Sequence, residues 1–366
     1  MSDDEASTAT ADLSNIADVI QQAGISGAGG AGFPSYAKWQ RIDEVDHLMV
    51  NHQESEPNYY IDKWLAKEYP DTFADLFDAL LGELIQTVVI GAKEKNREEW
   101  MGPLEELAPG VIYHPDDLPI DADDEDGVVY AYTADTYQLG MESVLLNMVA
   151  DTIIGRDLPM DHEFIVQNTE TLYNIQQALE NGQPVTTKWV HAGGDVPNHR
   201  FLEVPVGTPA VDVLEAAGLE GGEIPDDAIL ADGGPGWCFE CDLEPEDFGI
   251  TKRTNALLVL DRDVADDNTF GDGRINVLEA REWTSPDDER EPTERLEPEQ
   301  VFIPLITNPD FEGIVTPSEP TVSAGDEVSV GDVVAEPAEG ISNYHHASID
   351  GVVAEVTDGH VIIDRA

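Results

Sequence analysis

The sequence predicts an α/β protein in which a layered unit of helices and strands is followed by two smaller units built mainly of strands. In the first half of the chain, short apolar runs typical of buried strands alternate with segments whose apolar residues recur every three or four positions. In residues 183–262, paired strands flank one short helix, and residues 301–366 contain short strands separated by Gly-Asp turns. A chain of 366 residues is long enough for two or three domains.

The first unit is predicted to span residues 13–182, after a polar N-terminus (residues 1–12) that we expect to be disordered. Its predicted strands are 47–50, 87–91, 110–113 and 128–132. Its predicted helices are 13–23, 70–86, 94–107 and 140–154. In the last of these helices the expected core positions are Val144, Leu145, Met148, Val149 and Ile153.

A glycine-rich loop follows the first predicted helix. Gly27, Gly29, Gly30 and Gly32 fall within six residues, so this backbone carries almost no side-chain cover and its N–H groups can face a phosphate. Lys38 could add a positive charge nearby. The spacing satisfies G-x-G-x-x-G, but a dinucleotide-binding loop of that kind follows a strand, and this one follows a helix. The pattern favours a nucleotide or flavin phosphate loop in a different fold, with a plain glycine-rich turn as the alternative.

A second polar segment, residues 51–57, comes directly after the apolar run His47-Leu48-Met49-Val50. Ligand-binding loops lie at the carboxyl ends of strands in open α/β sheets. We therefore expect Asn51, Glu54 and Glu56 near the same ligand as the glycine loop.

Five motifs, in order along the chain, resemble a known family. These segments are similar to the flavoprotein subunit of respiratory complex I, and more similar to the C subunit of the Rnf electron-transport complex. Near the C-terminus, Ala347–Val353 is similar to a segment of the cobalamin reductases of propanediol utilisation. The five segments are Gly27–Trp39, Asn51–Pro57 with Asp62, Ile90–Asn96, Tyr137–Glu142 and Val166–Leu172. The resemblance implies an FMN-binding α/β domain of the complex I flavoprotein type.

The resemblance also implies roles for individual residues. The FMN phosphate would be held by the glycine loop and Lys38. The flavin pocket would be contacted or lined by Asn51, Tyr137, Gly140 and Asn168. The flavin and a nicotinamide nucleotide would be surrounded by Glu54, Glu56 and Glu142. Carboxylates suit ribose hydroxyls, which donate hydrogen bonds, and do not suit phosphate. The expected cofactor-binding residues are Gly27, Gly29, Gly30, Gly32, Lys38, Asn51, Glu54, Glu56, Tyr137, Gly140, Glu142 and Asn168.

The later units resemble other parts of the same family. Residues 183–262 are similar to its ubiquitin-like, soluble-ligand-binding β-grasp (SLBB) domain, with predicted strands at 185–192, 200–204, 229–232 and 256–260 and a helix at 209–218. Residues 263–300 are charged, contain prolines and have few apolar positions, so they are expected to be an acidic linker or a peripheral acidic segment. Residues 301–366 are expected to form a lipoyl-like barrel-sandwich hybrid. No lysine stands at its Ile349-Asp350-Gly351 turn to carry a lipoyl group.

The charge of the chain is unusual. It has 76 acidic residues and 18 Lys and Arg, with a formal net charge of −58 spread along the sequence. Such a surface argues against nucleic acid as a partner, which needs basic residues. It favours a high-salt cytoplasm, where ~1 M salt reduces the Debye length to ~3 Å. No signal peptide or membrane-spanning run is expected, so the protein is predicted to be cytoplasmic, possibly at the inner membrane face.

The two cysteines, Cys238 and Cys241, leave three interpretations open: an incidental or structural pair, a redox dithiol, or half of a metal site shared across a dimer. His345 and His346 are expected to be a surface pair. The ferredoxin-like cysteine runs of the Rnf-type relatives are missing, and two thiols cannot hold a four-thiolate cluster.

The family resemblance implies an FMN flavoprotein that takes hydride from NADH. Because the chain lacks cluster ligands, its electrons are expected to pass to an iron–sulfur or ferredoxin-like partner, or to a diffusible acceptor. A corrinoid reductase and a non-catalytic scaffold that kept the fold are the alternatives.

Overall fold

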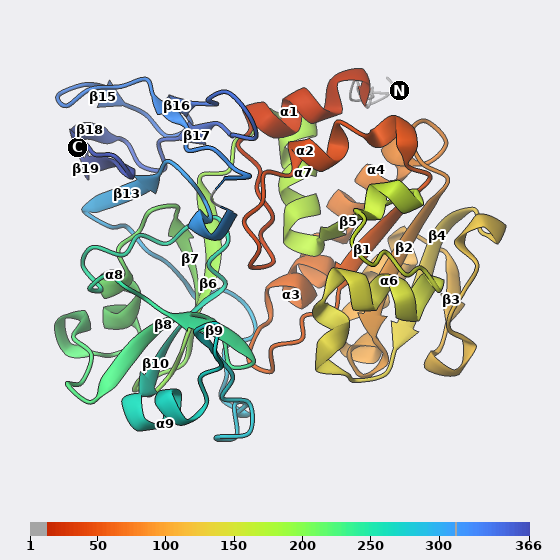
Figure 1. The fold of residues 1–366 in the computed structure, drawn as a ribbon, viewed down its shortest axis with the longest axis horizontal. Coiled ribbons are helices and arrows are strands. Elements are labelled where there is room, and N and C mark those ends of the chain that lie inside the picture. Colours follow the sequence, from red (N-terminus) through yellow and green to blue (C-terminus); the bar gives the residue numbers. More distant parts are fainter. Residues whose placement is uncertain (1–12, 312) are drawn as a thin grey trace, which may run out of the picture.

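The computed structural model describes residues 13–311 and 313–366, and the disorder expected for residues 1–12 lies outside this range. Figure 1 shows three bodies of structure that follow the order of the chain: the α/β unit in red to yellow, a strand-rich unit in green, and a smaller one in blue. The green unit lies beside the α/β unit and below the blue one, so that all three meet near α1 and the glycine loop.

The α/β unit is built on a five-stranded parallel sheet in the order β3-β4-β2-β1-β5. The four strands expected from apolar runs are confirmed, and β5 is a fifth that periodicity did not indicate. Parallel pairing brings the carboxyl ends of β1 and β5 together, with Asn51 opposite Asn168. The strands are β1 (His47–His52), β2 (Thr87–Lys93), β3 (Val111–Tyr113), β4 (Gly127–Thr133) and β5 (Phe164–Asn168).

Helices cover both faces of this sheet, as a parallel sheet requires. Alternate strand residues enter two separate cores: Leu48 and Val50 pack with α1, α3, α4, α5 and α7, whereas Met49 packs with α6. The helices are α1 (Ile16–Gln22), α2 (Tyr36–Trp39), α3 (Ile61–Glu68), α4 (Pro70–Leu80), α5 (Gly102–Leu107), α6 (Glu142–Ala150) and α7 (Thr169–Asn181). The expected helix 94–107 begins instead with a 3-10 turn and a π turn before α5.

The helix expected over 140–154 is shorter than predicted. It ends at Ala150 because Asp151 adopts a left-handed conformation, with φ of 49°. Met148 and Ile153, expected in the core, are therefore 51% and 73% exposed, and Leu146 is buried in their place.

The second unit is a seven-stranded sheet in the order β11-β9-β8-β10-β6-β7-β12. Its central strands β6 and β10 pair in parallel. On one side β6 forms an antiparallel hairpin with β7, and on the other side β10 pairs with β8 of the antiparallel β8–β9 hairpin, which is the β-grasp arrangement. Its elements are β6 (Thr187–Gly194), β7 (Arg200–Pro205), α8 (Ala210–Ala216), β8 (Ala228–Gly234), β9 (Trp237–Glu240), β10 (Ala256–Asp261), α9 (Arg262–Asp267), β11 (Arg274–Ile275) and β12 (Glu294–Arg295).

Residues 263–300 differ from the acidic linker that their composition suggested. They contain most of α9, and they add β11 to one edge of the seven-stranded sheet and β12 to the other. Val277 and Trp283 are buried against β8 and β10. A few apolar anchors in a charged segment are therefore enough to hold it on the sheet.

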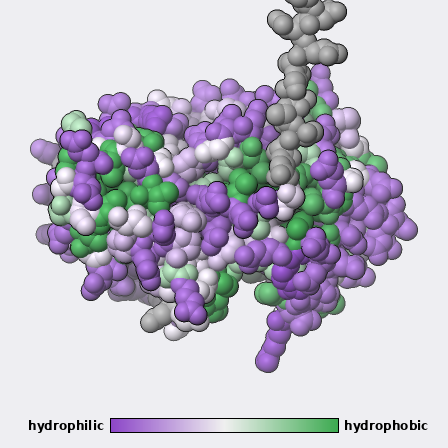
Figure 2. Space-filling model, turned by 90° about the horizontal axis from the view of Figure 1, so that it is seen from above, coloured by the Kyte–Doolittle hydropathy of each residue, from purple (hydrophilic) through white to green (hydrophobic). Residues whose placement is uncertain are grey.

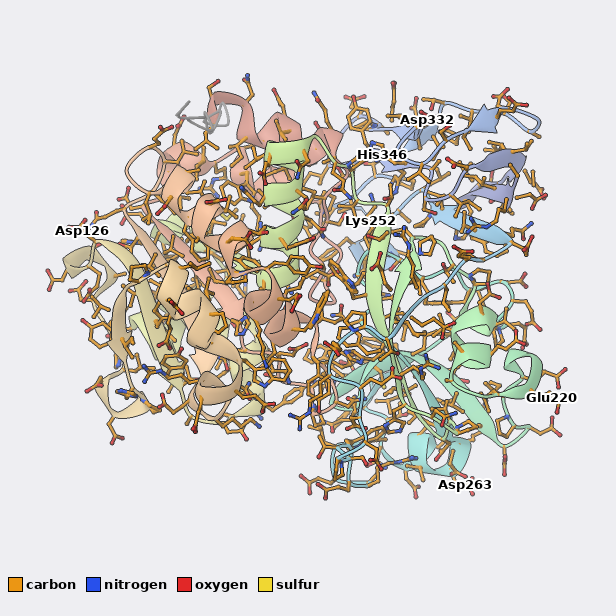
Figure 3. The ribbon with its side chains drawn as sticks, turned by 180° about the vertical axis from the view of Figure 1, so that it is seen from behind. Asp126, Glu220, Lys252, Asp263, Asp332 and His346 are labelled. Atoms are coloured by element: carbon orange, nitrogen blue, oxygen red, sulfur yellow. The ribbon has the colours of Figure 1, made fainter. Side chains whose placement is uncertain are left out.

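The third unit is a sandwich of a four-stranded and a three-stranded sheet around a small apolar core, as expected. Its strands are β13 (Gln300–Pro304), β14 (Glu319–Pro320), β15 (Glu327–Val328), β16 (Val333–Glu336), β17 (His345–His346), β18 (Gly351–Val356) and β19 (His360–Arg365). The expectation that His345 and His346 lie on the surface is wrong, because both are buried in β17. They lie near Lys252, whose ammonium donates to the carbonyl oxygens of Gly24 and Tyr344 where the three units meet (Figure 3).

Hydrophilic residues cover most of the face seen in Figure 2, with small apolar areas between them. Labelled acids such as Asp126, Glu220 and Asp263 lie on the outside of the molecule in Figure 3. Within the described residues, no helix is both long enough and apolar enough to cross a membrane.

Candidate cofactor site

A cavity of about 520 Å³ lies between the carboxyl ends of β1 and β5 and the β8–β9 hairpin of the second unit. This size is in the range of small-molecule sites. The cavity brings together eight of the twelve residues expected from the sequence: Gly29, Gly30, Asn51, Glu54, Glu56, Tyr137, Gly140 and Asn168. The other four, Gly27, Gly32, Lys38 and Glu142, do not line it.

The glycine loop is a closed turn that offers three backbone amides to the cavity. Gly27 N–H donates to Phe33 O at 2.8 Å and Gly32 N–H donates to Gly27 O at 2.9 Å, so these two amides close the turn. Gly29, Gly30 and Ala31 line the cavity, and their N–H groups have no acceptor among the described residues. Gly30 has φ of +98°, and a Cβ placed there would meet nothing within 4 Å. The loop therefore presents unpaired donors to an open space.

Asn51 and Asn168 fix the floor of the cavity from adjacent strands. The Asn51 amide donates to Gly140 O at 2.8 Å, which ties β1 to the turn before α6. The Asn168 carbonyl oxygen caps α7 by accepting from Thr171 N–H at 3.0 Å, and its amide nitrogen donates to Asp62 at 3.0 Å. Both side chains are held before any ligand enters.

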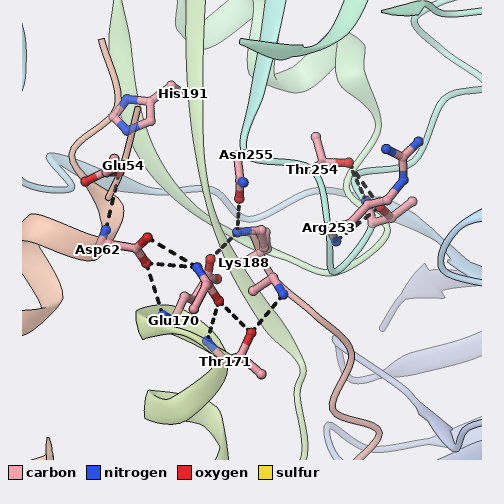
Figure 4. Close-up of polar contacts among 12 residues, drawn as sticks. Glu54, Asp62, Glu170, Thr171, Lys188, His191, Arg253, Thr254 and Asn255 are labelled. Atoms are coloured by element: carbon pink, nitrogen blue, oxygen red, sulfur yellow. Dashed lines mark hydrogen bonds and ion pairs between the residues drawn. The ribbon is translucent and has the colours of Figure 1, made fainter. Parts of the chain in front are cut away.

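Three buried carboxyl groups form the wall shown in Figure 4. Glu54 accepts from the N–H groups of Asp62 and Lys63, while Asp62 accepts from Glu170 N–H at 3.1 Å. The Glu170 carboxylate is paired with Lys188, whose ammonium also donates to Asn255 at 2.8 Å. Burial raises the pKa of Glu54, Asp62 and Glu170, and for Asp62 the charges of the other two raise it further.

Glu56 links the first unit to the second. Its carboxylate accepts from Tyr137 O–H at 2.5 Å and from Gly236 N–H at 2.8 Å in the β8–β9 turn. The turn fits closely, because a Cβ at Gly236 would lie 2.4 Å from the Tyr137 ring. Burial raises the pKa of Glu56 to about 7, although Tyr137 and Gly236 stabilise its charged form. At neutral pH this carboxyl is therefore poised between its two protonation states.

Lys38, expected at the FMN phosphate, lies beside the cavity and is not among its lining residues. Its ammonium donates to Glu142 at 2.8 Å and to the Val166 carbonyl at 3.0 Å, so Lys38 and Glu142 pair with each other beside the cavity. Arg253, from the second unit, is the only basic side chain among the described residues that line the cavity. Its guanidinium pairs with Asp232 at 3.1 Å, and a Cβ at Gly32 would lie 2.9 Å from its side chain.

The second unit supplies cavity residues that sequence reasoning missed. They include Asp232, Trp237, Phe239 and Arg253. No local motif marks them, because they reach the cavity through the packing of the β8–β9 hairpin on the first unit. The one local feature that could have drawn attention to this hairpin is the short segment that contains Trp237, Cys238 and Cys241.

The structure bears on the three interpretations of Cys238 and Cys241. Both thiols are free, Cys238 is buried, and burial together with nearby Glu56 and Asp232 raises the pKa of Cys238 to about 12. A thiol that resists ionisation is a poor nucleophile and metal ligand. Within the described residues no group of three or more His, Cys, Asp or Glu side chains is arranged to hold a metal. These observations favour a structural pair.

The cavity suits the FMN group that the sequence implies. A phosphate fits three unpaired amides beside one arginine, and the open space at Gly30 is where a Cβ would obstruct it. Asn51, Asn168 and the carboxyl wall offer acceptors to hydroxyl groups, and Tyr59, Trp237 and Phe239 offer rings to a planar group.

Comparison with protein families matches residues 20–177 to the Nuo51 FMN-binding domain and residues 280–364 to the RnfC barrel sandwich hybrid domain. The second match includes part of the segment that was expected to be a linker. The NAD+-reducing [NiFe]-hydrogenase crystal structure in the H2-reduced state is similar to 70% of this chain, over 48% of its own chain, with a TM-score of 0.54 and 20% sequence identity. That likeness supports the fold.

Two curated relatives are similar over about two thirds of this chain. The cobalamin reductase PduS of Citrobacter freundii is 30% identical over 251 residues, which is 68% of this chain and 50% of that protein. The C subunit of the ion-translocating oxidoreductase complex of Vibrio cholerae is 27% identical over 246 residues, 66% of this chain and 29% of that protein. The chain thus spans about half the length of the cobalamin reductases and less of the C subunits. These matches support the family that the motifs indicated: the chain is similar to the Rnf C subunits and the cobalamin reductases, and residues 20–177 match the Nuo51 FMN-binding domain.

Proposed function

We propose that the chain binds one FMN, accepts a hydride from NADH, and passes electrons to a separate acceptor. One observation carries this proposal: the cavity joins unpaired glycine-loop amides to acid and amide acceptors at the carboxyl ends of β1 and β5. The relatives named as oxidoreductases support the redox class.

In this proposal the phosphate end of FMN lies at Gly29, Gly30 and Ala31. Their amides supply hydrogen bonds that need no side-chain ordering, and Arg253 supplies the charge that the resemblance gave to Lys38. Asn51 and Asn168, fixed by Gly140 and Asp62, orient the ring system. When bound, the flavin supplies the hydride and electron chemistry, and the protein supplies position and electrostatics.

The carboxyl groups on the opposite wall would bind the sugar hydroxyls of the nucleotide. Glu56 is held by Tyr137 and Gly236 at the junction of the two units, so a nucleotide that enters there meets a carboxyl that can accept or donate a hydrogen bond near neutral pH. Glu54 is held more rigidly by two backbone N–H groups. Glu142, paired with Lys38, would act by keeping that lysine in place.

For the acceptor, we propose an iron–sulfur or ferredoxin-like partner, because two thiols cannot hold a four-thiolate cluster. The protein would work in a high-salt cytoplasm, possibly at the inner membrane face as part of a larger complex. A corrinoid reductase is the second candidate, favoured by the match to PduS. A non-catalytic scaffold is the third.

The visible spectrum of purified protein, recorded before and after anaerobic NADH, tests this proposal. We expect a yellow protein with one FMN per chain whose flavin absorbance is bleached by NADH. Rapid cobalamin reduction with no partner present would favour the corrinoid reductase. A colourless protein that cannot be reconstituted with FMN would favour the non-catalytic scaffold.

A further inference from the structure

An arginine next to the cavity residue Trp237 is stacked between two aromatic rings. The Arg274 guanidinium carbon lies 4.6 Å from the ring centre of Trp237 and 4.6 Å from that of Phe270. The turn that carries Phe270 and Arg274 is closed by Phe270 N–H donating to Arg274 O at 2.8 Å. β11 then pairs with β9, so that Arg274 lies opposite Phe239, two residues after Trp237 on the same strand. We refer to these three residues as the Trp237–Arg274–Phe270 stack.

Arg274 has no carboxylate partner among the described residues, which is unusual in so acidic a chain. Its guanidinium forms no ion pair with any described residue, although most of the described arginines and lysines do. Asp272, in the same turn, accepts the Arg274 backbone N–H at 3.2 Å and does not pair with the guanidinium. The Arg274 Nε atom is buried and has no hydrogen-bond partner in the described part of the chain. The two rings therefore hold a cation whose N–H groups remain available.

The stack is continuous with the cavity. Trp237 lines the cavity, carries Arg274 over its ring and remains 42% exposed. The neighbouring Gly236 N–H donates to Glu56 at 2.8 Å, so the β8–β9 turn is fixed to the cavity wall.

We infer that the Trp237–Arg274–Phe270 stack binds the adenylate end of the nicotinamide nucleotide, with adenine on the indole of Trp237 and a phosphate on the guanidinium of Arg274. An aromatic face suits a base, and an arginine without a carboxylate partner suits a phosphate. This inference rests on the proposed function, because it places one end of the proposed electron donor. The phosphate that meets Arg274 is either the diphosphate, common to NADH and NADPH, or the 2′-phosphate of NADPH.

Titration calorimetry with two probes, 5′-ADP and 2′,5′-ADP, tests the inference on flavin-loaded protein in the salt used for purification. We expect Arg274→Gln to weaken binding about tenfold, as for the loss of one charged hydrogen bond. Arg262→Gln is the matched control, because Arg262 lies in the same unit and pairs with Glu240 on the surface. Arg274→Lys keeps the charge but loses the planar fork, so its binding should be intermediate.

The two probes separate the sources of phosphate. An equal loss for both probes places on Arg274 the 5′-phosphate that both carry, which is the adenosine-side phosphate of the diphosphate in NADH and NADPH. A larger loss for 2′,5′-ADP places the 2′-phosphate there. Trp237→Phe, which keeps a ring, should weaken both probes less than Trp237→Ala. Wild-type affinity in Arg274→Gln, or no binding of either probe by the wild type, would overturn the inference. Flavin content, measured on the same samples, reports separately on the proposed function.

Discussion

The protonation of Glu56 can be tested through the stability of the protein. The perturbation is Glu56→Gln, which keeps the size of the side chain and its ability to accept from Gly236 N–H, but removes the charge. The pKa of Glu56 rises from an ordinary 4.5 to about 7 because burial disfavours the carboxylate. The folded state therefore binds this proton more tightly than the unfolded state does.

The sign and size of the effect follow from linkage. A carboxyl whose pKa is raised by folding stabilises the native state while it is protonated, and that stabilisation is lost as pH rises from about 4.5 through about 7. Each pKa unit corresponds to ~1.4 kcal/mol, so the loss is at most ~3 kcal/mol above pH 8. Because Glu56 keeps some exposure to solvent, this figure is an upper bound.

The assay is denaturant unfolding of the flavin-free protein at constant molar salt between pH 5 and 8.5. We expect Glu56→Gln to match the wild type near pH 5 and to be more stable by up to ~3 kcal/mol near pH 8.5. Glu220→Gln, at an exposed position on the outside of the second unit (Figure 3), should show no such pH dependence. A stability difference between Glu56→Gln and wild type that is the same at both ends of the range would refute a raised pKa at Glu56.

Three further predictions concern the loop, the surface and the acceptor. Gly30→Val should abolish FMN binding, because its side chain enters the open space at the loop. Gly82→Val should retain FMN, because Gly82 is equally open, with φ of +76°, but does not line the cavity. Stoichiometric flavin in Gly30→Val would remove this loop from the site. The melting temperature should rise steeply between about 0.1 and 3 M salt as carboxylate repulsion is screened, and a flat profile would contradict the high-salt interpretation. Metal analysis of the protein purified alone should find no stoichiometric iron, and a pull-down at high salt should recover a cysteine-rich partner. Stoichiometric iron in the isolated chain would contradict the argument that two thiols cannot hold a four-thiolate cluster.

The sequence was most informative where a local pattern decides the structure. Apolar runs identify β1, β2, β3 and β4 because a parallel strand buried on both faces must be apolar throughout. Motif order indicates the family and eight of the cavity residues. Gly29 and Gly30 belong to the loop after α1, and the other six lie at or after the ends of β1, β4 and β5 in the same unit. β5 was missed because its short apolar run is followed at once by the polar residues of the Asn168 cap.

The remaining errors have physical causes outside any local window. Periodicity continued the helix past Ala150, but one left-handed residue, Asp151, ends it. Composition made residues 263–300 look like a linker, because in a chain this acidic the surface of a packed segment is as charged as a linker. The role of Lys38 at the phosphate stays a prediction, because in the ligand-free structure its ammonium pairs with Glu142 beside the cavity. Arg253 reaches the glycine loop from more than 200 residues away, and only tertiary packing reveals it.

The distribution of charge within the cavity also orients its ligand. Glu54, Asp62 and Glu170 lie on one wall, and burial is the main cause that raises the pKa of each, whereas Lys63 and Lys188 favour the charged forms. A phosphate brought against this wall would meet like charge in a poorly solvated place, whereas hydroxyl groups would find acceptors. The glycine-loop amides and Arg253 are the donors on the other side. This arrangement of charge supports the proposal that FMN binds with its phosphate toward Gly30 and that the second nucleotide enters past Glu56, next to Trp237 and the Arg274 stacked on it.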